Sequence, residues 1–259
     1  MKTIVITGST RGIGFALAKA LLNKGNRVVI SGRTKDSLDK ALKLLSDDYP
    51  VESVAGFACD VREFNQVQAL WNYSTEKFGN IDIWINNAGI SNRQTPPWAL
   101  SETEIRSVIE TNMLGEIFGA KVALTGFLNQ GYGAVYNLEG MGAQRRRGVK
   151  GLSIYGATKA GLRYFNDSVP LEIENDRIIL GAIQPGMVLT DMVTSQYEGK
   201  SEEWDKVKGI LTTISEDVDI VAEWLADKII KNKKNGVRFT YGGMLRIIFR
   251  MIFKKSKIT

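Results

Sequence analysis

A glycine-rich turn close to the N-terminus constrains the fold more than any other feature of this 259-residue sequence. The turn reads Thr7-Gly8-Ser9-Thr10-Arg11-Gly12-Ile13-Gly14; the apolar residues 3–6 precede it, and a stretch with helical periodicity, residues 14–23, follows. Glycines allow the backbone to turn sharply and to approach a ligand closely. A helix that begins at such a turn directs its positive N-terminus toward it. The segment therefore predicts a binding site for the pyrophosphate of a nucleotide.

Strand-like and helical stretches alternate along the chain. Apolar runs typical of strands cover residues 3–6, 27–31, 51–58, 81–85, 134–138 and 178–183, and helical periodicity covers residues 14–23, 35–45 and 64–78. Another amphipathic helix is expected after the capping residues Ser215-Glu216. The alternation predicts an α/β fold, a Rossmann-type doubly wound parallel sheet of about seven strands with helices on both faces. We expect a single domain, residues 1–243, followed by a basic amphipathic tail, residues 244–259.

The end of the second predicted strand indicates which nucleotide binds. It reads Ile30-Ser31-Gly32-Arg33. NAD-binding sites place a carboxylate here to bond the ribose 2′-hydroxyl, whereas this chain has Gly32 followed by Arg33. Arg33 together with Arg11 would suit a 2′-phosphate, so the sequence predicts NADP(H) as the cofactor. The alternative is that both arginines are solvated surface charges.

Composition excludes several kinds of chemistry. The chain contains no histidine and a single cysteine, Cys59. Histidine-based triads and metal sites are therefore excluded, no metal is predicted, and proton transfer at neutral pH must use other groups. A lone cysteine forms no disulfide within the chain and suits a reducing compartment. No signal peptide is visible and no apolar run reaches about 18 residues, so we expect a cytoplasmic protein without a spanning helix.

Tyr155 and Lys159 form the candidate proton-handling pair. Their i, i+4 spacing places the phenol and the ammonium group on one face of a helix that follows the fifth predicted strand. A free phenol ionises near pH 10, and a neighbouring ammonium group stabilises the phenolate and makes it a better acid-base catalyst near neutral pH. Taken alone, a pair with this spacing is usually structural.

Taken together, these segments resemble the short-chain dehydrogenase/reductase family over essentially the whole chain. The matching segments occur in that family's order: the glycine-rich turn, Asn86-Asn87-Ala88-Gly89, Asn112, Tyr155-x-x-x-Lys159 and Pro185-Gly186. The resemblance implies an oxidoreductase that transfers hydride to or from a carbonyl or alcohol carbon of a small molecule. It also implies a homodimer or a homotetramer.

The resemblance implies roles for individual residues. Tyr155 would be the general acid/base, Lys159 would bind the nicotinamide ribose and tune Tyr155, and Asn112 would hold a proton-relay water. Asp60 would hold the adenine, Asn86 would shape the pocket, and Val188 and Thr190 would reach the carboxamide. The complete cofactor-binding set lies in the turn and at the ends of later strands: Gly8, Ser9, Thr10, Arg11, Gly12, Ile13, Gly14, Arg33, Asp60, Val61, Asn86, Ala88, Gly89, Tyr155, Lys159, Pro185, Gly186, Val188 and Thr190.

One segment departs from the family pattern. The family ends its fifth strand with a serine that bonds the substrate oxygen, whereas this strand reads Asn137-Leu138-Glu139-Gly140-Met141-Gly142, with Gly140 at the serine position. Either Ser153 replaces the missing donor or Tyr155 acts alone, and a Gly140→Ser substitution should be tolerated. Pro170 is expected to kink or end the helix about three turns beyond Lys159.

Several local patterns are similar to a narrower group, the chlorophyll b reductases. They are Ile83-Trp84-Ile85 before Asn86, the strand end without serine, the residues that follow Tyr155, and the segment 185–191. The similarity implies that NADPH reduces the formyl group of a chlorophyll-b-like tetrapyrrole or of another bulky, apolar aldehyde or ketone. Two alternatives stay open: a dehydrogenase of small alcohols or sugars, and a catalytically weak NADP(H)-binding sensor or scaffold.

Basic charge is concentrated at the C-terminus. The net charge is +6, and residues 231–259 contain nine Lys/Arg and no Asp/Glu, so the preceding residues carry −3. Arg246, Arg250 and Lys254 stand four apart among apolar residues, which suits either a helix at a membrane surface or one packed against a subunit. The run 145–147, three arginines, is either a solvated loop or a contact for an acidic or membrane-surface substrate. No nucleic-acid partner is predicted, because no recognisable reading module accompanies the charge.

Overall fold

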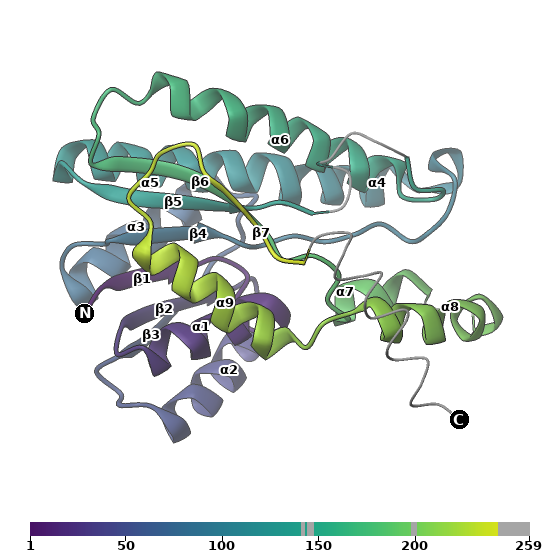
Figure 1. The fold of residues 1–259 in the computed structure, drawn as a ribbon, viewed down its shortest axis with the longest axis horizontal. Coiled ribbons are helices and arrows are strands. Elements are labelled where there is room, and N and C mark those ends of the chain that lie inside the picture. The colour runs from purple at the N-terminus through teal and green to yellow at the C-terminus, as the bar shows by residue number, and fades with distance from the viewer. Residues whose placement is uncertain (141–142, 144–147, 198–200, 243–259) are drawn as a thin grey trace.

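A seven-stranded parallel sheet forms the centre of the molecule (Figure 1). The computed structural model describes residues 1–140, 143, 148–197 and 201–242. The strand order is β3-β2-β1-β4-β5-β6-β7, and every adjacent pair is parallel. The strands are β1 (Thr3–Ile6), β2 (Arg27–Gly32), β3 (Val54–Ala58), β4 (Ile83–Asn86), β5 (Gly133–Leu138), β6 (Ile178–Gln184) and β7 (Arg238–Thr240). The predicted fold class is confirmed.

Helices connect the strands. The α-helices are α1 (Gly12–Asn23), α2 (Lys35–Asp48), α3 (Phe64–Phe78), α4 (Glu102–Ile109), α5 (Gly115–Gln130), α6 (Ser153–Glu172), α7 (Asp191–Thr194), α8 (Ser201–Ile214) and α9 (Val218–Lys231). A π-helical turn, η2 (Glu110–Leu114), joins α4 to α5, and short 3-10 turns are η1 (Pro97–Ala99) and η3 (Ser195–Tyr197). Within the described part of the chain, no helix combines the length and apolarity that crossing a bilayer requires.

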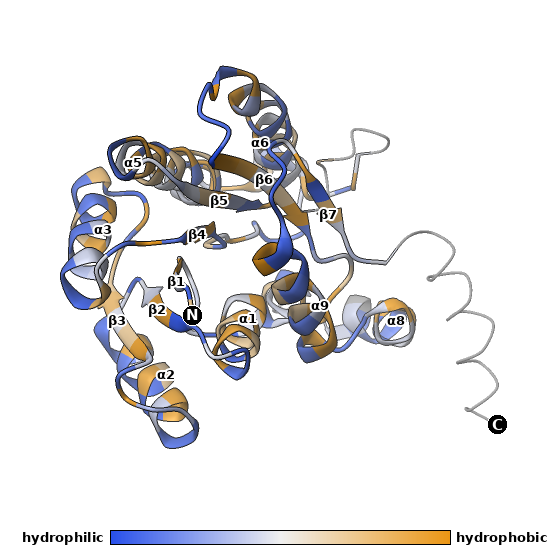
Figure 2. Ribbon diagram, turned by 60° about the vertical axis from the view of Figure 1, so that its left-hand side comes forward, coloured by the Kyte–Doolittle hydropathy of each residue, from blue (hydrophilic) through white to orange (hydrophobic). Residues whose placement is uncertain are grey.

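The sheet is buried on both faces because helices cover each side (Figure 2). Successive side chains of a strand point to opposite faces, so Ile4 and Ile6 of β1 pack with α1, α2 and α9, whereas Val5 packs with α3 and α5. All three side chains are fully buried. A strand of this kind needs apolar residues at every position, which explains the continuous run at residues 3–6.

The observed elements differ from the predicted ones mainly at their ends. Residues 51–53 form a turn before β3, and Ile81 precedes β4. The side chain that caps α9 belongs to Asp217, which accepts a hydrogen bond from the Asp219 amide, and not to Ser215 or Glu216. Helix α6 ends at Glu172, two residues beyond Pro170, as the proline predicted. The tail, residues 244–259, lies outside the described residues.

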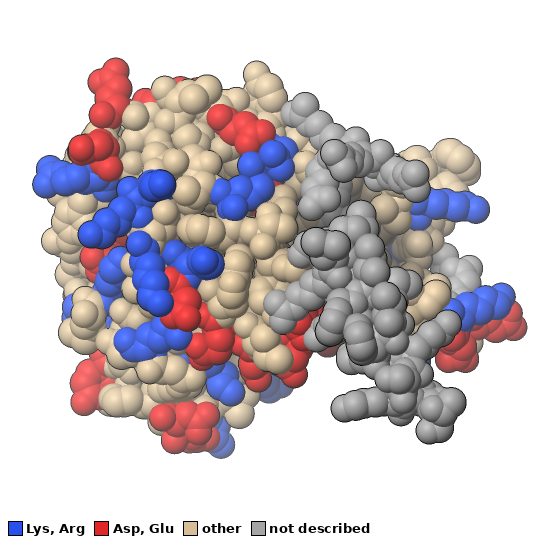
Figure 3. Space-filling view, in the orientation of Figure 1, with Lys and Arg blue, Asp and Glu red and all other residues tan. Residues whose placement is uncertain are grey.

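The strand order places one edge of the sheet in position to bind a ligand. Strand β1 lies between β2 and β4, so the chain leaves β1 toward one side of the sheet and later returns to the other side. In open parallel sheets, ligands bind at the carboxyl ends of the strands on either side of such a switch point. On the face that Figure 3 shows, basic and acidic side chains intermingle over the described surface.

Candidate active site

The glycine-rich turn packs tightly against the end of β4. Gly8 has a φ of +61°, and a β-carbon there would lie 2.6 Å from the α-carbon of Ala88. Gly12 also has a positive φ, +59°, and opens α1, where no described side chain caps the helix N-terminus. Only glycine adopts these backbone angles without strain. The first turn of α1 thus presents amide groups that an anionic group can reach.

Asn87 fastens this turn to the sheet. Its side-chain amide donates to the carbonyl oxygens of Thr7 and Gly8 at 2.9 and 2.8 Å. Its main-chain N–H donates to the Thr7 hydroxyl at 3.0 Å, and the Ala88 N–H donates to the same oxygen at 3.2 Å. These bonds join the ends of β1 and β4 directly. Neither Thr7 nor Asn87 was among the predicted site residues, although Thr7 begins the glycine-rich turn and Asn87 lies in the segment Asn86-Asn87-Ala88-Gly89.

Ser9 and Thr10 connect the turn to β2. The Ser9 hydroxyl donates to the Ile6 carbonyl at 2.7 Å and accepts from the Ser31 amide at 3.0 Å, so it holds the turn in place. The Thr10 methyl group fills the space where a β-carbon on Gly32 would lie. An acidic side chain at position 32 could therefore enter only if Thr10 moved.

Asp60, the residue expected to hold adenine, pairs with Arg62. The Arg62 guanidinium donates to both carboxylate oxygens, at 2.9 Å from Nε and 2.6 Å from Nη2. These hydrogen bonds hold the pKa of the Asp60 carboxyl below its usual range, and the charge of Arg33 contributes a smaller lowering. Burial raises the pKa of the adjacent Cys59 thiol to about 12, so this cysteine stays protonated and unreactive. The adenine contact of Asp60 stays a prediction.

The Tyr155 hydroxyl lies directly against Gly140. A β-carbon built on Gly140 would overlap this oxygen and would lie 3.5 Å from Cε of Lys159. Gly140→Ser, which was expected to be tolerated, therefore requires the phenol of Tyr155 to move, because the added side chain would otherwise overlap it. Ser153 is exposed in the first turn of α6, and residues two apart on a helix face different directions. The structure thus gives Ser153 no place beside the Tyr155 hydroxyl.

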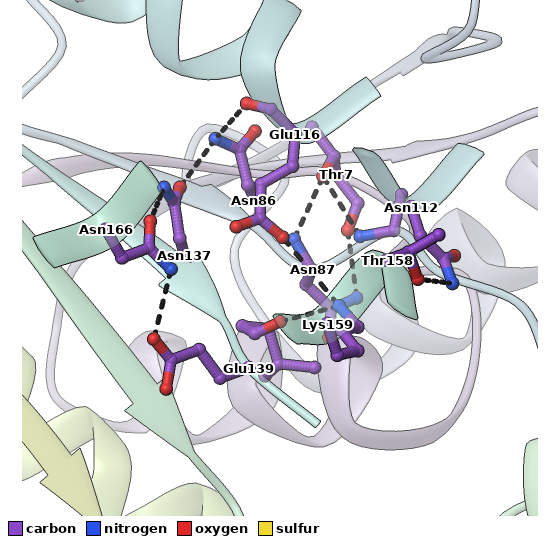
Figure 4. A network of polar contacts seen from close by, with 12 residues as sticks. Thr7, Asn86, Asn87, Asn112, Glu116, Asn137, Glu139, Thr158, Lys159 and Asn166 are labelled. Atoms are coloured by element: carbon purple, nitrogen blue, oxygen red, sulfur yellow. Dashed lines mark hydrogen bonds and ion pairs between the residues drawn. The ribbon is translucent and has the colours of Figure 1, made fainter. Parts of the chain in front are cut away.

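Lys159 is buried behind Tyr155, with its side chain only 4% exposed. Its ammonium group donates to the Leu138 carbonyl oxygen at 2.8 Å and lies 3.8 Å from Oε2 of Glu116 (Figure 4). Both partners are on other elements, the end of β5 and the start of α5. A buried cation requires such partners, because desolvation alone would disfavour its charge.

Asn112 lies in the π-helical turn and is fully buried. Its Oδ1 accepts from the Ile90 amide at 2.8 Å, and its Nδ2 donates to the Ile90 carbonyl at 2.9 Å and to the Thr158 hydroxyl at 3.3 Å. Asn112 therefore joins the loop after β4 to α6 (Figure 4). Both of its N–H donors are in use, so a relay water would have to bond the remaining lone pair of Oδ1 or the main chain.

Asn86 connects the two strands and the helix that position the site residues. Its Oδ1 accepts from the Trp84 indole at 2.8 Å, and its Nδ2 donates to Oδ1 of Asn137 at 2.8 Å and to the Glu116 carbonyl at 3.2 Å. These bonds fix β4 against β5 and α5. Asn86 can shape the pocket only through the residues that it positions, because its amide is occupied by the protein.

The segment after β6 approaches the glycine-rich turn. Gly186 has a φ of +73°, and Val188 is buried and forms a bridge with Glu216. A β-carbon on Gly12 would lie 3.7 Å from the Thr190 methyl group, so Thr190 reaches the turn. The other predicted members of the cofactor-binding set also lie at this edge of the sheet: Ile13 on α1, Gly89 beside Asn112, Val61 beside α5 and Pro185 after β6.

Asn92 is a site residue that the sequence did not reveal. Its Oδ1 accepts from the Tyr155 amide at 3.2 Å, and its Nδ2 donates to the Gly151 carbonyl at 2.9 Å. Asn92 thereby fixes the start of α6, and with it the position of Tyr155. No local pattern indicates a contact that spans 63 residues of sequence. Met141, Gly142 and the arginines 145–147 lie outside the described residues.

Comparison with known proteins identifies relatives along most of the chain. Residues 2–201 match the family model described as short chain dehydrogenase. The chain is 34% identical over 231 residues to a chloroplastic chlorophyll(ide) b reductase of Oryza sativa subsp. japonica, covering 87% of this chain and 66% of that protein. It is 30% identical over 267 residues to a chloroplastic protein of Arabidopsis thaliana that carries the name probable chlorophyll(ide) b reductase, covering 97% of this chain and 52% of that protein.

A solved structure of another reductase has a similar fold. A variant of actinorhodin polyketide ketoreductase with NADPH superposes with a TM-score of 0.83 at 27% identity, over 95% of this chain and 97% of that one. The chain thus spans between about half and two thirds of the length of the two chlorophyll(ide) b reductases, 52% and 66%.

Proposed function

The chain belongs to the short-chain dehydrogenase family, and we propose that it is an NADPH-dependent reductase of a bulky, apolar aldehyde or ketone. The observation that carries this proposal is the arrangement of Tyr155, Gly140 and Lys159 at the carboxyl ends of the strands. A phenol with a buried ammonium group behind it is suited to donate a proton to a carbonyl oxygen. Membership of the family makes the chain an oxidoreductase that uses a nicotinamide cofactor.

The residues at the glycine-rich turn fit a dinucleotide. Gly8 lets the turn pack against Ala88, and Gly12 and the uncapped first turn of α1 present amide groups that a pyrophosphate can reach. Thr10 fills the space beside Gly32 in which an NAD-type site has a carboxylate, and Arg33 is exposed next to it. We therefore propose Arg33 and Arg11 as the ligands of a ribose 2′-phosphate, which makes NADP(H) the preferred cofactor.

The protein's own groups would handle the proton. When bound, the nicotinamide supplies the hydride that adds to the carbonyl carbon. Tyr155 donates its hydroxyl proton to the substrate oxygen, and Lys159 stabilises the phenolate that remains. Asn92 holds Tyr155 at the start of α6, and Leu138 holds the ammonium group of Lys159. The remaining site residues position the cofactor or the strands around it.

The proposed substrate class rests on the chain's relatives and on the residue at position 140. Two relatives carry the name chlorophyll(ide) b reductase, one of them as probable, and this chain has no serine at position 140, where the Tyr155 hydroxyl meets the segment after β5. Without that second donor, the substrate oxygen relies on Tyr155, which favours an activated carbonyl such as a ring-conjugated formyl group. We accordingly propose a chlorophyll-b-like tetrapyrrole as the first substrate to test.

The test is a substrate panel followed by the loss of NADPH absorbance at 340 nm. Chlorophyllide b, bulky aromatic aldehydes and small ketones or sugars are compared at equal concentration. The proposal expects turnover of the bulky apolar members and little of the small polar ones. Preference for small alcohols or sugars would replace it with an ordinary dehydrogenase, and NADPH binding without any turnover would favour a sensor.

Location and assembly are further parts of the proposal. We propose a cytoplasmic enzyme that forms a homodimer or a homotetramer, with a small molecule as its only required partner. Contact of residues 244–259 with a membrane surface is proposed as the route by which an apolar substrate reaches the site. Light scattering of the full chain tests the assembly, and the vesicle experiment in the Discussion tests the membrane contact.

A further inference from the structure

Glu116 is a buried acid that the chemistry above does not use. It is the second residue of α5, immediately after the π-helical turn, and its side chain is 2% exposed. Oε2 lies 3.8 Å from the Lys159 ammonium nitrogen, whereas Oε1 has no hydrogen-bond partner among the described residues. A buried carboxyl group with one unpartnered oxygen is costly, so its presence beside Lys159 calls for a functional reason.

The surroundings of Glu116 contain few charges. Lys159 on α6 and Glu139, the residue after β5, are the ionisable groups whose charges act on it, and the neutral Asn166 on α6 also lies nearby. On β4, the neutral Asn86 bonds the Glu116 main chain, and on the loop beside α5, Asp60 and Arg62 neutralise each other. Glu139 is itself paired with Arg238 at 2.8 Å. Among the described residues, Lys159 is therefore the only cation near Glu116 that forms no ion pair with another carboxylate.

We propose that Glu116 is a positioning residue for Lys159, holding the ammonium group beside the Leu138 carbonyl and controlling, through its own ionisation, how strongly that group stabilises an ionised Tyr155. The inference rests on the proposed role of Lys159 and adds a second acid to that site. When Glu116 is protonated, the ammonium charge acts on Tyr155 without compensation. When Glu116 is ionised, its negative charge at 3.8 Å from the nitrogen offsets part of that effect.

The protonation state of Glu116 changes in the range where the enzyme would work. Burial raises the pKa of the Glu116 carboxyl to about 8, and the neighbouring Lys159 charge opposes part of this rise. Two coupled groups lose their protons in macroscopic steps that belong to the pair. Ionisation of Tyr155 should therefore follow a broader pH dependence in the natural protein than in a protein without the Glu116 carboxylate.

The experiment uses the full chain and needs no substrate. The absorbance of tyrosinate near 295 nm is followed from pH 6 to 11, and subtraction of the matching Tyr155→Phe protein isolates the Tyr155 transition. In Glu116→Gln, which keeps the shape but cannot ionise, we expect a sharper transition whose midpoint lies about one pH unit lower. Glu76→Gln removes an exposed carboxylate from α3 and should leave the curve unchanged.

Two more variants make the outcome decisive. In a Lys159→Met background, Glu116→Gln should move the midpoint by less than a third as much, because the effect acts through the ammonium group. If Glu116→Gln does not fold, Glu116→Asp, with a shorter reach toward Lys159, should give a smaller shift in the same direction. An unchanged midpoint in the folded Gln or Asp variant, or an equal shift without Lys159, would overturn the inference. Failure of the proposed function itself would be recognised separately, because Tyr155→Phe would then turn over substrate at the full rate.

Discussion

The hydroxyl oxygen of Tyr155 occupies the space that a β-carbon on residue 140 would need. The phenol of Tyr155, on α6, thus fills the space left by the missing side chain of Gly140, the second residue after β5. This relationship changes the expected result of restoring a serine at position 140.

Gly140→Ser and Gly140→Ala should both displace Tyr155. Overpacking of this kind costs about 1–3 kcal/mol of stability, and a misplaced proton donor should lower kcat at least about tenfold, which is about 1.4 kcal/mol of barrier. Gly156→Ala on α6 is the matched control, because a β-carbon there meets nothing within 4 Å. Urea unfolding and turnover of the three variants test this expectation. Higher activity in Gly140→Ser would show that the phenol moves aside without cost.

Tyr155→Phe should abolish turnover and leave NADPH binding nearly intact. The substitution removes the proton donor and keeps the ring, whereas Lys159→Ala should impair both, since Lys159 is proposed to serve both the ribose and the phenol. NADPH fluorescence gives the affinity and absorbance at 340 nm gives the rate. Turnover at the original rate in Tyr155→Phe would assign the proton donor to another group.

NADPH should bind at least about tenfold more tightly than NADH, and Arg33→Ala should remove most of that difference. A charge-assisted hydrogen bond contributes about 1.5–3 kcal/mol, which corresponds to about 10-fold to 150-fold in affinity. Lys40→Ala, an exposed cation on α2, serves as the control for a general loss of charge. Calorimetric titration of the natural protein and the two variants with both cofactors gives the dissociation constants needed. Equal affinities in the natural protein would contradict the assignment of the phosphate site.

Glu116 should make the protein less stable as the pH rises. An ordinary Glu ionises near 4.5, and burial raises the pKa of Glu116 to about 8, so between these values the folded state holds one more proton than the unfolded state. The free energy of unfolding should then fall by up to about 1.4 kcal/mol for each pH unit in this window. The stabilisation is complete below the lower value and lost above the upper one.

Glu116→Gln removes this dependence, so its stability relative to the natural protein should increase between pH 5 and pH 9. Urea unfolding at both pH values measures the difference. An equal difference in the free energy of unfolding between the two proteins at both pH values would show that Glu116 is already ionised in the folded state.

The tail should bind anionic membranes if it forms an interfacial helix. Each basic residue near such a surface contributes about 1 kcal/mol, in addition to apolar burial. The full chain should float with phosphatidylserine vesicles, release them as salt rises, and lose binding when it is truncated after Gly243. A change in oligomer mass on truncation, without any effect of lipid, would instead place the tail at a subunit interface.

The sequence by itself determined the features that depend on local periodicity and spacing. The apolar run at residues 3–6 predicted a strand buried on both faces, and the glycines of the first turn predicted a sharp bend at a helix N-terminus. The i, i+4 spacing of Tyr155 and Lys159 placed them on one face of α6. Each of these inferences needs only a short segment, because dihedral restrictions and helical or strand repeats act over a few residues.

Only the tertiary structure decided which distant residues support that pair. Asn92 meets the Tyr155 amide across 63 residues of sequence, and Glu116 meets Lys159 from a different helix. Likewise, the sequence indicated that Gly140 lacks a side chain, but not that the Tyr155 hydroxyl fills the vacant volume. Contacts of this kind depend on the order of the strands and the packing of helices over them, so no pattern of neighbouring residues encodes them.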